Sequence, residues 1–460
     1  AIWPASRRVS GCFAMDFVEL TKTARAHAER GEIAAARQLY SAWLERDPEA
    51  IEPLGYLGRL ALVNNELPRS IELLERATKL QPDHAEIMQD LGIAYRRAQR
   101  VDEAMLTLQH AVDIDPSQRR SRLHLGAIQE SRGETHVALV NYFAAVSNAQ
   151  GQGLWRSRET TPTPLLPMVE HAIAVIERER PKLLDRSIAP LRDRYGRDAL
   201  QRVEQSLAMY LEQIPTTYAD PRQKPTFLYF PGLPTTPWFE RALFPWYEEL
   251  ESRWNAIREE LLTVIDDRAQ LVPFLDSPVN IQGLPFMGST GASASEPQWD
   301  AYFFHRHGVR YNDHCARCPI TATALDAAPI VRIRDHAPEC LYSVLSPGAH
   351  ILPHRGVTNT RTVTHLPLIV PGNGALCVAG EARAWQEGRC FSFDDTFLHE
   401  AWNHSDQTRV ILLLDSWNPH MTEVEQLAIS ELVAAIGDFS KETNTSIPGD
   451  SDTTDASIAT

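Results

Sequence analysis

The feature that most constrains this chain is a spacing of 34 residues that recurs through its N-terminal third. At this spacing, three prolines and three Leu-Gly pairs come into register: Pro48, Pro82 and Pro116, with Leu57-Gly58, Leu91-Gly92 and Leu125-Gly126. Small residues let two helices approach closely, and a proline ends one helix before the next begins. The spacing therefore predicts a row of stacked helix pairs.

This pattern resembles the tetratricopeptide repeat. Four units fit, at residues 17–50, 51–84, 85–118 and 119–152. An ordinary helical bundle is the alternative. Repeats of this kind resemble peptide-binding superhelices, so the resemblance implies a peptide or protein partner, which a fold by itself does not name.

Charge and composition narrow the classes of partner and location. Lys plus Arg number 45 against 60 for Asp plus Glu, a net charge of −15. This balance disfavours nucleic acid and anionic membrane surfaces and favours a basic partner. Neither a membrane span nor a signal peptide is expected, because no apolar run reaches about 18 residues. Six scattered cysteines do not form a secreted disulfide framework, so we expect a cytoplasmic protein.

The rest of the chain divides by its residue pattern. Residues 1–16 form an N-terminal extension, and residues 153–224 a helical linker with helices at 166–179 and 197–213. Residues 225–439 form the second large domain, in which 237–262 is expected to be one helix. Residues 440–460 are rich in Ser, Thr and Asp and are expected to be a disordered tail.

Short apolar or β-branched runs dominate residues 225–439 and predict an antiparallel sandwich or jelly roll. They lie at 341–345, 363–370, 375–378, 389–394 and 409–417, separated by Gly, Pro, Asn or Asp. The fold class is therefore multidomain α + β, a helical repeat array followed by a double-stranded β-helix. His354 follows one such region and His399 precedes another, so both can reach one metal ion.

Two histidines suit iron, but the usual non-haem iron site adds a carboxylate two residues after the first histidine. Gly356 stands at that position. Ordinary hydrogen-bonded core histidines are the alternative, and Asp395 is more easily explained as part of a turn than as a ligand. Arg409 begins an apolar run, where a buried guanidinium needs an anion such as the far carboxylate of 2-oxoglutarate, or else a structural salt bridge to Asp415.

Several ordered motifs resemble the aspartyl/asparaginyl β-hydroxylase family over roughly residues 226–430. They are the run from Ser343 to Arg361, Val363-Thr364-His365-Leu366, Trp385-Gln386-Glu387-Gly388, Phe393-Asp394-Asp395, His399-Glu400-Ala401-Trp402 and Trp417-Asn418-Pro419. Upstream tetratricopeptide repeats are also similar to that family. The resemblance implies an Fe(II)- and 2-oxoglutarate-dependent dioxygenase that uses O2 to hydroxylate the β-carbon of an Asp or Asn residue.

The resemblance also assigns residues by position. It implies that His354 and His399 bind Fe(II) without a protein carboxylate, so Gly356 agrees with the family. The 2-oxoglutarate contacts fall on Trp299, Ser343, Val363, Thr364, His365 and Arg409. We expect Arg361 to be the catalytic-site residue that clamps a substrate carboxylate or amide. Val363 stands where the animal enzymes have an arginine that also touches the substrate, which leaves the substrate identity open.

Other functions remain open at this point. The open position at Gly356 is also what a non-haem iron halogenase needs. The barrel could instead be an inactive scaffold, or the substrate could be a free or carrier-bound amino acid. Cys315 and Cys318 are expected to be structural, with a disulfide or a zinc site as alternatives.

Overall fold

The computed structural model describes residues 16–265, 270–274, 287–289 and 298–445, and the expected N-terminal extension at 1–16 lies almost wholly outside them. The chain divides into two compact units. One runs to Arg180 and includes residues 442–445, and the other runs from Pro181 to Lys441. No described helix is both long and apolar enough to cross a membrane.

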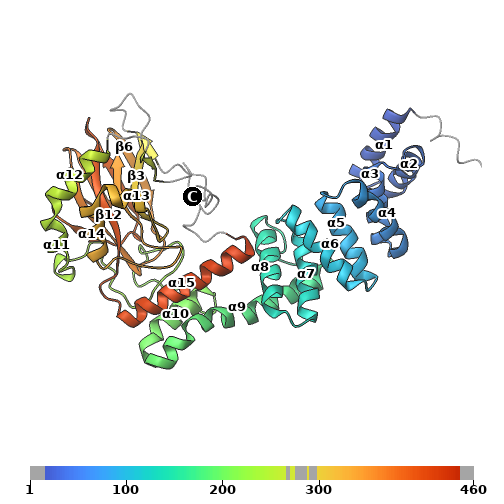
Figure 1. Ribbon diagram of the computed structural model, residues 1–460. Helices are drawn as coiled ribbons and strands as arrows, with labels where there is room; N and C mark the ends of the chain where they lie inside the picture. Colours follow the sequence, from blue (N-terminus) through green and yellow to red (C-terminus); the bar gives the residue numbers. More distant parts are fainter. Residues whose placement is uncertain (1–15, 266–269, 275–286, 290–297, 446–460) are drawn as a thin grey trace, which may run out of the picture. The chain divides into compact units, whose positions relative to one another are not determined.

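In the described part of the first unit, the repeats form eight antiparallel helices in four pairs, one pair for each predicted repeat, and the start of α9 (Leu166–Tyr195) follows them (Figure 1). They are α1 (Phe17–Glu29), α2 (Ile33–Arg46), α3 (Ile51–Val63), α4 (Leu67–Leu80), α5 (Ala85–Arg97), α6 (Val101–Ile114), α7 (Arg119–Ser131) and α8 (Thr135–Gly151). The repeat prediction is confirmed.

The glycine of each Leu-Gly pair lies where the two helices of a repeat touch. A Cβ on Gly92 would lie 2.6 Å from a side-chain atom of Leu108, and one on Gly126 would lie 2.6 Å from Tyr142. These distances are far shorter than a van der Waals contact, so only glycine permits the observed packing. The 34-residue spacing of glycines therefore records the helix contacts themselves.

Two linker helices were predicted, and the first is longer than the sequence indicated. Helix α9 (Leu166–Tyr195) continues through Pro181 and Pro190, where the sequence predicted an end near residue 179. A proline removes one helical hydrogen bond, but Leu184 and Ile188 are buried along the same helix and their packing offsets that cost. A 3-10 turn, η1 (Asp198–Leu200), leads into α10 (Gln201–Tyr210).

The second unit is built on two antiparallel sheets. The larger has the order β1-β3-β5-β12-β7-β10 with β4 beside β3, and the smaller the order β2-β6-β11-β8-β9. The larger comprises β1 (Val272–Pro273), β3 (Trp299–Arg306), β4 (Val309–Arg310), β5 (Cys340–Leu345), β7 (Arg361–Ile369), β10 (Phe391–Phe393) and β12 (Arg409–Trp417). The smaller comprises β2 (Met287–Ser289), β6 (Ala349–His354), β8 (Gly374–Val378), β9 (Glu381–Arg383) and β11 (His399–Asn403). Each predicted strand overlaps an observed one.

The larger sheet buries both faces. Leu341 and Ile411 pack toward the smaller sheet, while Tyr342 and Leu412, one residue further along each strand, pack against helices on the opposite face. Those helices are α11 (Tyr247–Ser252), α12 (Trp254–Val264), α13 (Asn312–Arg317) and α14 (Pro319–Ala327) (Figure 1). The space between the two sheets is thus an apolar core that can hold a shielded site.

The predicted single helix at 237–262 is wrong. The segment forms a 3-10 turn, η2 (Arg241–Leu243), followed by α11 and α12 as separate helices. Pro245 disfavours helical backbone at the residue before it, and Phe244 accordingly has φ −125° and ψ 67°.

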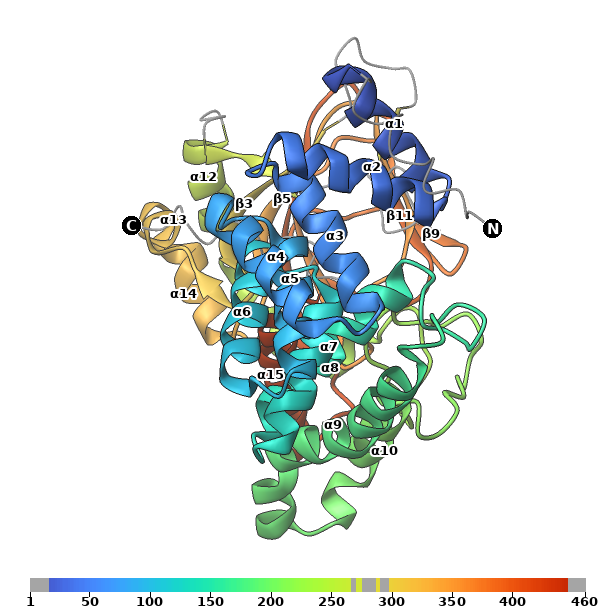
Figure 2. The ribbon, with the colours of Figure 1, turned by 90° about the vertical axis from the view of Figure 1, so that its right-hand side faces the viewer.

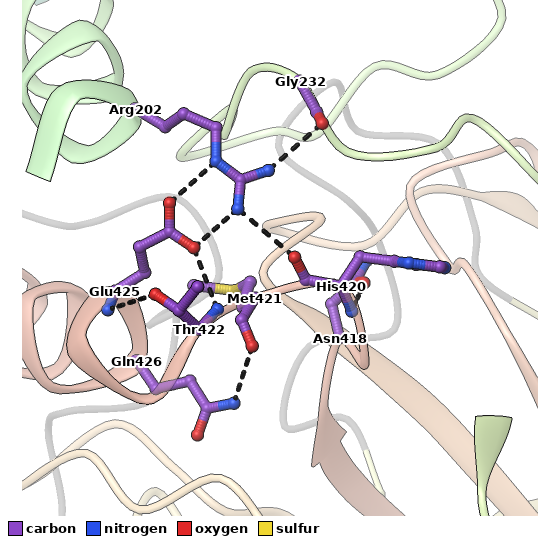
Figure 3. A network of polar contacts seen from close by, with 8 residues as sticks. All are labelled: Arg202, Gly232, Asn418, His420, Met421, Thr422, Glu425 and Gln426. Atoms are coloured by element: carbon purple, nitrogen blue, oxygen red, sulfur yellow. Dashed lines mark hydrogen bonds and ion pairs between the residues drawn. The ribbon is translucent and has the colours of Figure 1, made fainter. Parts of the chain in front are cut away.

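A polar network fixes the C-terminal helix α15 (Glu423–Thr443) within this unit (Figure 3). Arg202 of α10 donates to both carboxylate oxygens of Glu425, at 2.7 and 2.6 Å, and to the carbonyl oxygens of Gly232 and His420. Thr422 and Glu425 cap the start of the helix reciprocally. Helix α15 continues past the predicted boundary at 439 because Phe439 and Thr443 are buried, and only residues 446–460 of the expected tail lie outside the described chain.

Candidate active site

The two candidate metal-binding histidines lie side by side in the smaller sheet. His354 is the last residue of β6, His399 is the first of the neighbouring strand β11, and the two are directly opposite in the antiparallel register. Their ring centroids are 4.1 Å apart. Strand pairing therefore brings together two residues that are 45 positions apart in the sequence.

Both imidazoles are oriented by their own backbone. Nδ1 of His354 lies 2.8 Å from the carbonyl oxygen of Leu352, and Nδ1 of His399 lies 3.0 Å from that of Phe397. A ring that donates from Nδ1 carries its lone pair on Nε2, which is the form that coordinates a metal. Burial lowers the pKa of both histidines, and the neighbouring His354 lowers that of His399 further, so both are neutral at pH 7.

The carboxylate of Asp395 fills the space that a side chain at position 356 would need. A Cβ built on Gly356 would lie 2.0 Å from Oδ2 of Asp395, whose carbonyl oxygen accepts a hydrogen bond from the Gly356 amide at 2.7 Å. Burial raises the pKa of Asp395 to about 7, against the opposing effect of Arg361. No group of three His, Cys, Asp or Glu residues among the described ones is arranged to hold a metal. A metal here would have two protein ligands.

Arg409 is a buried cation at the start of β12, with only 2% of its surface exposed. Its guanidinium donates to the carbonyl oxygen and hydroxyl of Ser343, both at 3.3 Å, and lies 5.0 Å from the ring of Trp385. No carboxylate of the described chain lies within ion-pair distance, and its Nε has no hydrogen-bond partner there. The alternative of a salt bridge to Asp415 is wrong, because Asp415 pairs with Arg361 at 2.8 Å. Burial lowers the pKa of Arg409 to about 9, which leaves it charged at neutral pH.

The other expected cosubstrate residues fall into two groups. Trp299 donates its indole hydrogen to the Ser343 hydroxyl at 2.9 Å, and Val363 and His365 share the face of β7 that looks into the core between the sheets. Thr364 faces the other way, where its hydroxyl lies 2.5 Å from that of Ser392. The structure therefore brings five of the six together and places the Thr364 side chain on the far side of the sheet.

Arg361 stands at the beginning of β7, with its guanidinium 2.8 Å from the buried carboxylate of Asp415. The side chain is 17% exposed. A charge-assisted hydrogen bond to a buried carboxylate fixes its position. Its expected role as a substrate clamp remains a prediction.

The sequence placed Trp385 in a motif but did not indicate its contacts with His365 and Arg409. Its indole nitrogen donates to Nδ1 of His365 at 3.3 Å, and its ring lies beneath Arg409. The signal that could have found it is its place in one of the motifs that resemble the family, Trp385-Gln386-Glu387-Gly388.

Contacts among these residues form a closed circuit. The ring of His354 lies 6.3 Å from that of Trp299, which bonds Ser343, which in turn bonds Arg409. On the other side, Trp385 links Arg409 to His365. The ring of Phe393 lies 5.2 Å from that of His365 and 5.5 Å from that of His399, and so completes the circuit. Two paired imidazoles and one buried guanidinium therefore share a single site.

Cys315 and Cys318 lie outside this site. Both are buried free thiols, so the disulfide alternative is wrong for this structure. Burial raises the pKa of each thiol, which keeps it protonated at neutral pH.

Two parts of the chain match known families. Residues 251–419 match the aspartyl/asparaginyl beta-hydroxylase family, and residues 57–119 match a tetratricopeptide repeat. The chain is 32% identical over 195 residues to the ornithine lipid ester-linked acyl 2-hydroxylase of Rhizobium tropici. The aligned region covers 42% of this chain and 64% of that protein.

Two animal proteins are similar over the same part of the chain. Identity is 30% over 202 residues to the human aspartyl/asparaginyl beta-hydroxylase, covering 43% of this chain and 25% of that protein. Identity is 34% over 216 residues to the mouse aspartate beta-hydroxylase domain-containing protein 2, covering 46% of this chain and 60% of that protein. The chain thus spans less than two thirds of the length of each of these relatives. It joins an array of tetratricopeptide repeats to a domain of the aspartyl/asparaginyl beta-hydroxylase family.

Proposed function

We propose that the chain is an Fe(II)- and 2-oxoglutarate-dependent dioxygenase. In this proposal its two sheets form a jelly roll, and it hydroxylates the β-carbon of an Asp, Asn or related residue in a peptide or protein that the repeats help to bind. The observation that carries the proposal is the buried guanidinium of Arg409, which has no carboxylate partner among the described residues and lies in the same circuit of contacts as His354 and His399. A buried charge without a partner is costly, so a site of this kind needs an anion to complete it.

The donor set fits both the metal and the cosubstrate. The paired neutral imidazoles would hold Fe(II), and Arg409 with the Ser343 hydroxyl would hold the far carboxylate of 2-oxoglutarate. Trp299 and His365 would line the path between them. Iron bound there with 2-oxoglutarate and dioxygen supplies the oxidation of a substrate C–H bond.

The protein's own contribution is positioning and exclusion of water. Trp299, Phe393 and Trp385 place aromatic rings around the two ligand groups, and the backbone bonds to Nδ1 fix both imidazoles before a metal arrives. The carboxylate of Asp395 blocks a side chain at position 356, so one coordination position that other iron sites give to a protein carboxylate is left to small molecules.

The test is anaerobic titration of the protein with Fe(II) and 2-oxoglutarate, observed through the weak visible charge-transfer band of the chelate. The wild type should give the band, His354→Ala should abolish it, and Arg409→Ala should require far more 2-oxoglutarate. A well-folded wild type without a band would favour the inactive scaffold instead. Turnover with dioxygen should then add one oxygen atom to an Asp- or Asn-containing peptide, whereas a chlorinated product would indicate the halogenase.

A second candidate is hydroxylation of a free or carrier-bound amino acid or another small molecule. The relative from Rhizobium tropici favours it, since that protein is named as a hydroxylase of a lipid-linked acyl chain. The same turnover assay separates the two, because 2-oxoglutarate consumption would then be stimulated by the small molecule and not by peptides.

A further inference from the structure

A cluster of cations lies on the first helices of three consecutive repeats. Nε of Arg59 on α3 is 2.5 Å from Oδ2 of Asp90 on α5, and a terminal nitrogen of Arg120 on α7 is 3.8 Å from Oδ1 of the same residue. Asp90 is only 1% exposed. Helices α3, α5 and α7 succeed one another along the array (Figure 2), so one buried carboxylate serves arginines from both neighbours.

A second row of cations lies beside the first. Arg96 of α5 is 2.7 Å from Nδ1 of His124 on α7, and Arg97 donates to the carbonyl oxygen of Leu62. Neither arginine has a carboxylate within 4.0 Å among the residues that the structure describes. We call Arg59, Arg96, Arg97, Arg120 and His124 the basic face. Its four arginines have two carboxylates within 4.0 Å among the described residues, Asp90 and, beside Arg59 at 3.3 Å, Glu86, although the whole chain is acidic.

The basic face is partly shielded from solvent and yet open to it. The side chains of Arg59 and Arg120 are 49% and 40% exposed. Burial nevertheless lowers the pKa of Arg96 and Arg120, and nearby arginines lower each pKa further. Nε of Arg120 and Oδ1 of Asp90 are buried without a hydrogen-bond partner in the described chain. Guanidinium groups that are crowded together, partly desolvated and incompletely paired form a site for an external anion.

We propose that the basic face binds an acidic segment of the polypeptide substrate, an inference that rests on the proposed function. Carboxylates on alternate residues of an extended segment are roughly 7 Å apart, whereas neighbouring helices lie about 8–10 Å apart, so one segment can engage α5 and α7 together. The fork of an arginine matches a carboxylate with two hydrogen bonds. A nucleic acid is disfavoured because the charge of −15 on the whole chain repels a long polyanion.

The experiment is a fluorescence anisotropy titration of the full-length chain, without iron or 2-oxoglutarate, using a labelled peptide of alternating Asp and Gly. A peptide with Asn in place of each Asp is the matched probe. The test variant is Arg96→Gln with Arg120→Gln. The control is Arg37→Gln with Arg69→Gln, which removes the same charge from α2 and α4. Circular dichroism checks that each variant is folded.

The wild type and the control should bind the Asp peptide, and the test variant should bind it about 10-fold more weakly, a change of about 1.4 kcal/mol. The charge-reversed chain, Arg96→Glu with Arg120→Glu, should prefer a Lys and Gly peptide, a gain that unfolding cannot produce. Equal affinity of the wild type for the Asp and Asn peptides would overturn the proposal. So would equal losses in the test and control variants, or tighter binding of a single-stranded oligonucleotide.

The outcome is independent of the chelate band. An acidic-peptide site on a chain that gives no band would contradict the proposed function and leave the basic face as a docking site. A chain that gives the band but shows no preference for the Asp peptide would contradict this inference alone.

Discussion

Arginines without full charge compensation occur in both units of the molecule, in two different settings. In the sheet unit, Arg409 is 2% exposed, donates hydrogen bonds to Ser343 and lies against the ring of Trp385. In the repeats, Arg59 and Arg120 are 49% and 40% exposed and share the buried carboxylate of Asp90, while Arg96 has no carboxylate within 4.0 Å among the described residues. The first setting suits one small anion in one orientation, and the second suits an extended anion that touches several cations.

The difference follows from how each unit is built. Pairing of β12 with β5 places Arg409 and Ser343 in a core closed by aromatic rings, so the guanidinium cannot follow a moving ligand. Stacked repeats instead present side chains from successive helices on one open surface. A rigid, buried site favours tight and selective binding of a small anion, while an open site can contact an extended ligand at several points.

The largest effect that tests this comparison is expected at Arg409. Arg409→Gln should weaken 2-oxoglutarate binding by about 100-fold, or about 2.7 kcal/mol, because it removes the cation that we propose for the far carboxylate. Arg409→Lys should retain part of the affinity, since it keeps the charge and loses the fork. The measurement is the concentration of 2-oxoglutarate that half-saturates the chelate band.

The stability of the same variant separates a binding role from a structural one. Because the buried guanidinium has no carboxylate partner within the described residues, Arg409→Gln should leave the unfolding temperature unchanged or raise it. Arg389→Gln, at an exposed arginine of the same unit, is the control. A large fall in stability for Arg409→Gln alone would show that Arg409 supports the fold.

The two units also differ in what their sequences predict. The repeats could be predicted because each helix contact joins residues close in the chain, so a glycine such as Gly92 recurs with the period of the repeats. The strands and the two histidines could be predicted from alternation and motifs. Contacts between the sheets could not be predicted, because they depend on the register of the strands. Examples are the hydrogen bond from Trp385 to His365 and the face of the sheet on which the Thr364 side chain lies.

Local rules also failed where packing opposed them. Pro181 and Pro190 favour breaks, but the buried side chains of α9 keep the helix continuous. The contact of Asp395 with Gly356 is likewise invisible in the sequence, where the aspartate is four residues before one histidine and the glycine two residues after the other. Only the three-dimensional arrangement shows that the two positions compete for one volume.

The competition between Gly356 and Asp395 for one volume predicts a loss of stability when position 356 gains a side chain. Gly356→Ala should destabilise the sheet unit by about 2 kcal/mol, because its Cβ would overlap the Asp395 carboxylate and the core would have to shift. Asp395→Ala in the same chain should remove the obstacle and restore most of the loss. Chemical unfolding of the two single variants and the double variant measures this coupling. Additive losses would contradict the overlap.

The smallest expected effect concerns His124 in the basic face. Burial and the neighbouring arginines lower the pKa of His124 to about 3. The folded chain therefore does not take up a proton at this site as the pH falls below about 6.5, whereas the unfolded chain does, so acid favours unfolding there. Between pH 7 and pH 5.5 the repeats should lose about 1 kcal/mol more in the wild type than in His124→Gln. Urea unfolding at both pH values measures the difference, with His110→Gln on α6 as the control. Arg409 stays charged between pH 5.5 and pH 7. The intensity of the chelate band should therefore not follow the pH dependence of stability that His124 causes. If the band and the stability changed with pH in the same way, the two arginine settings would be less different than their burial indicates.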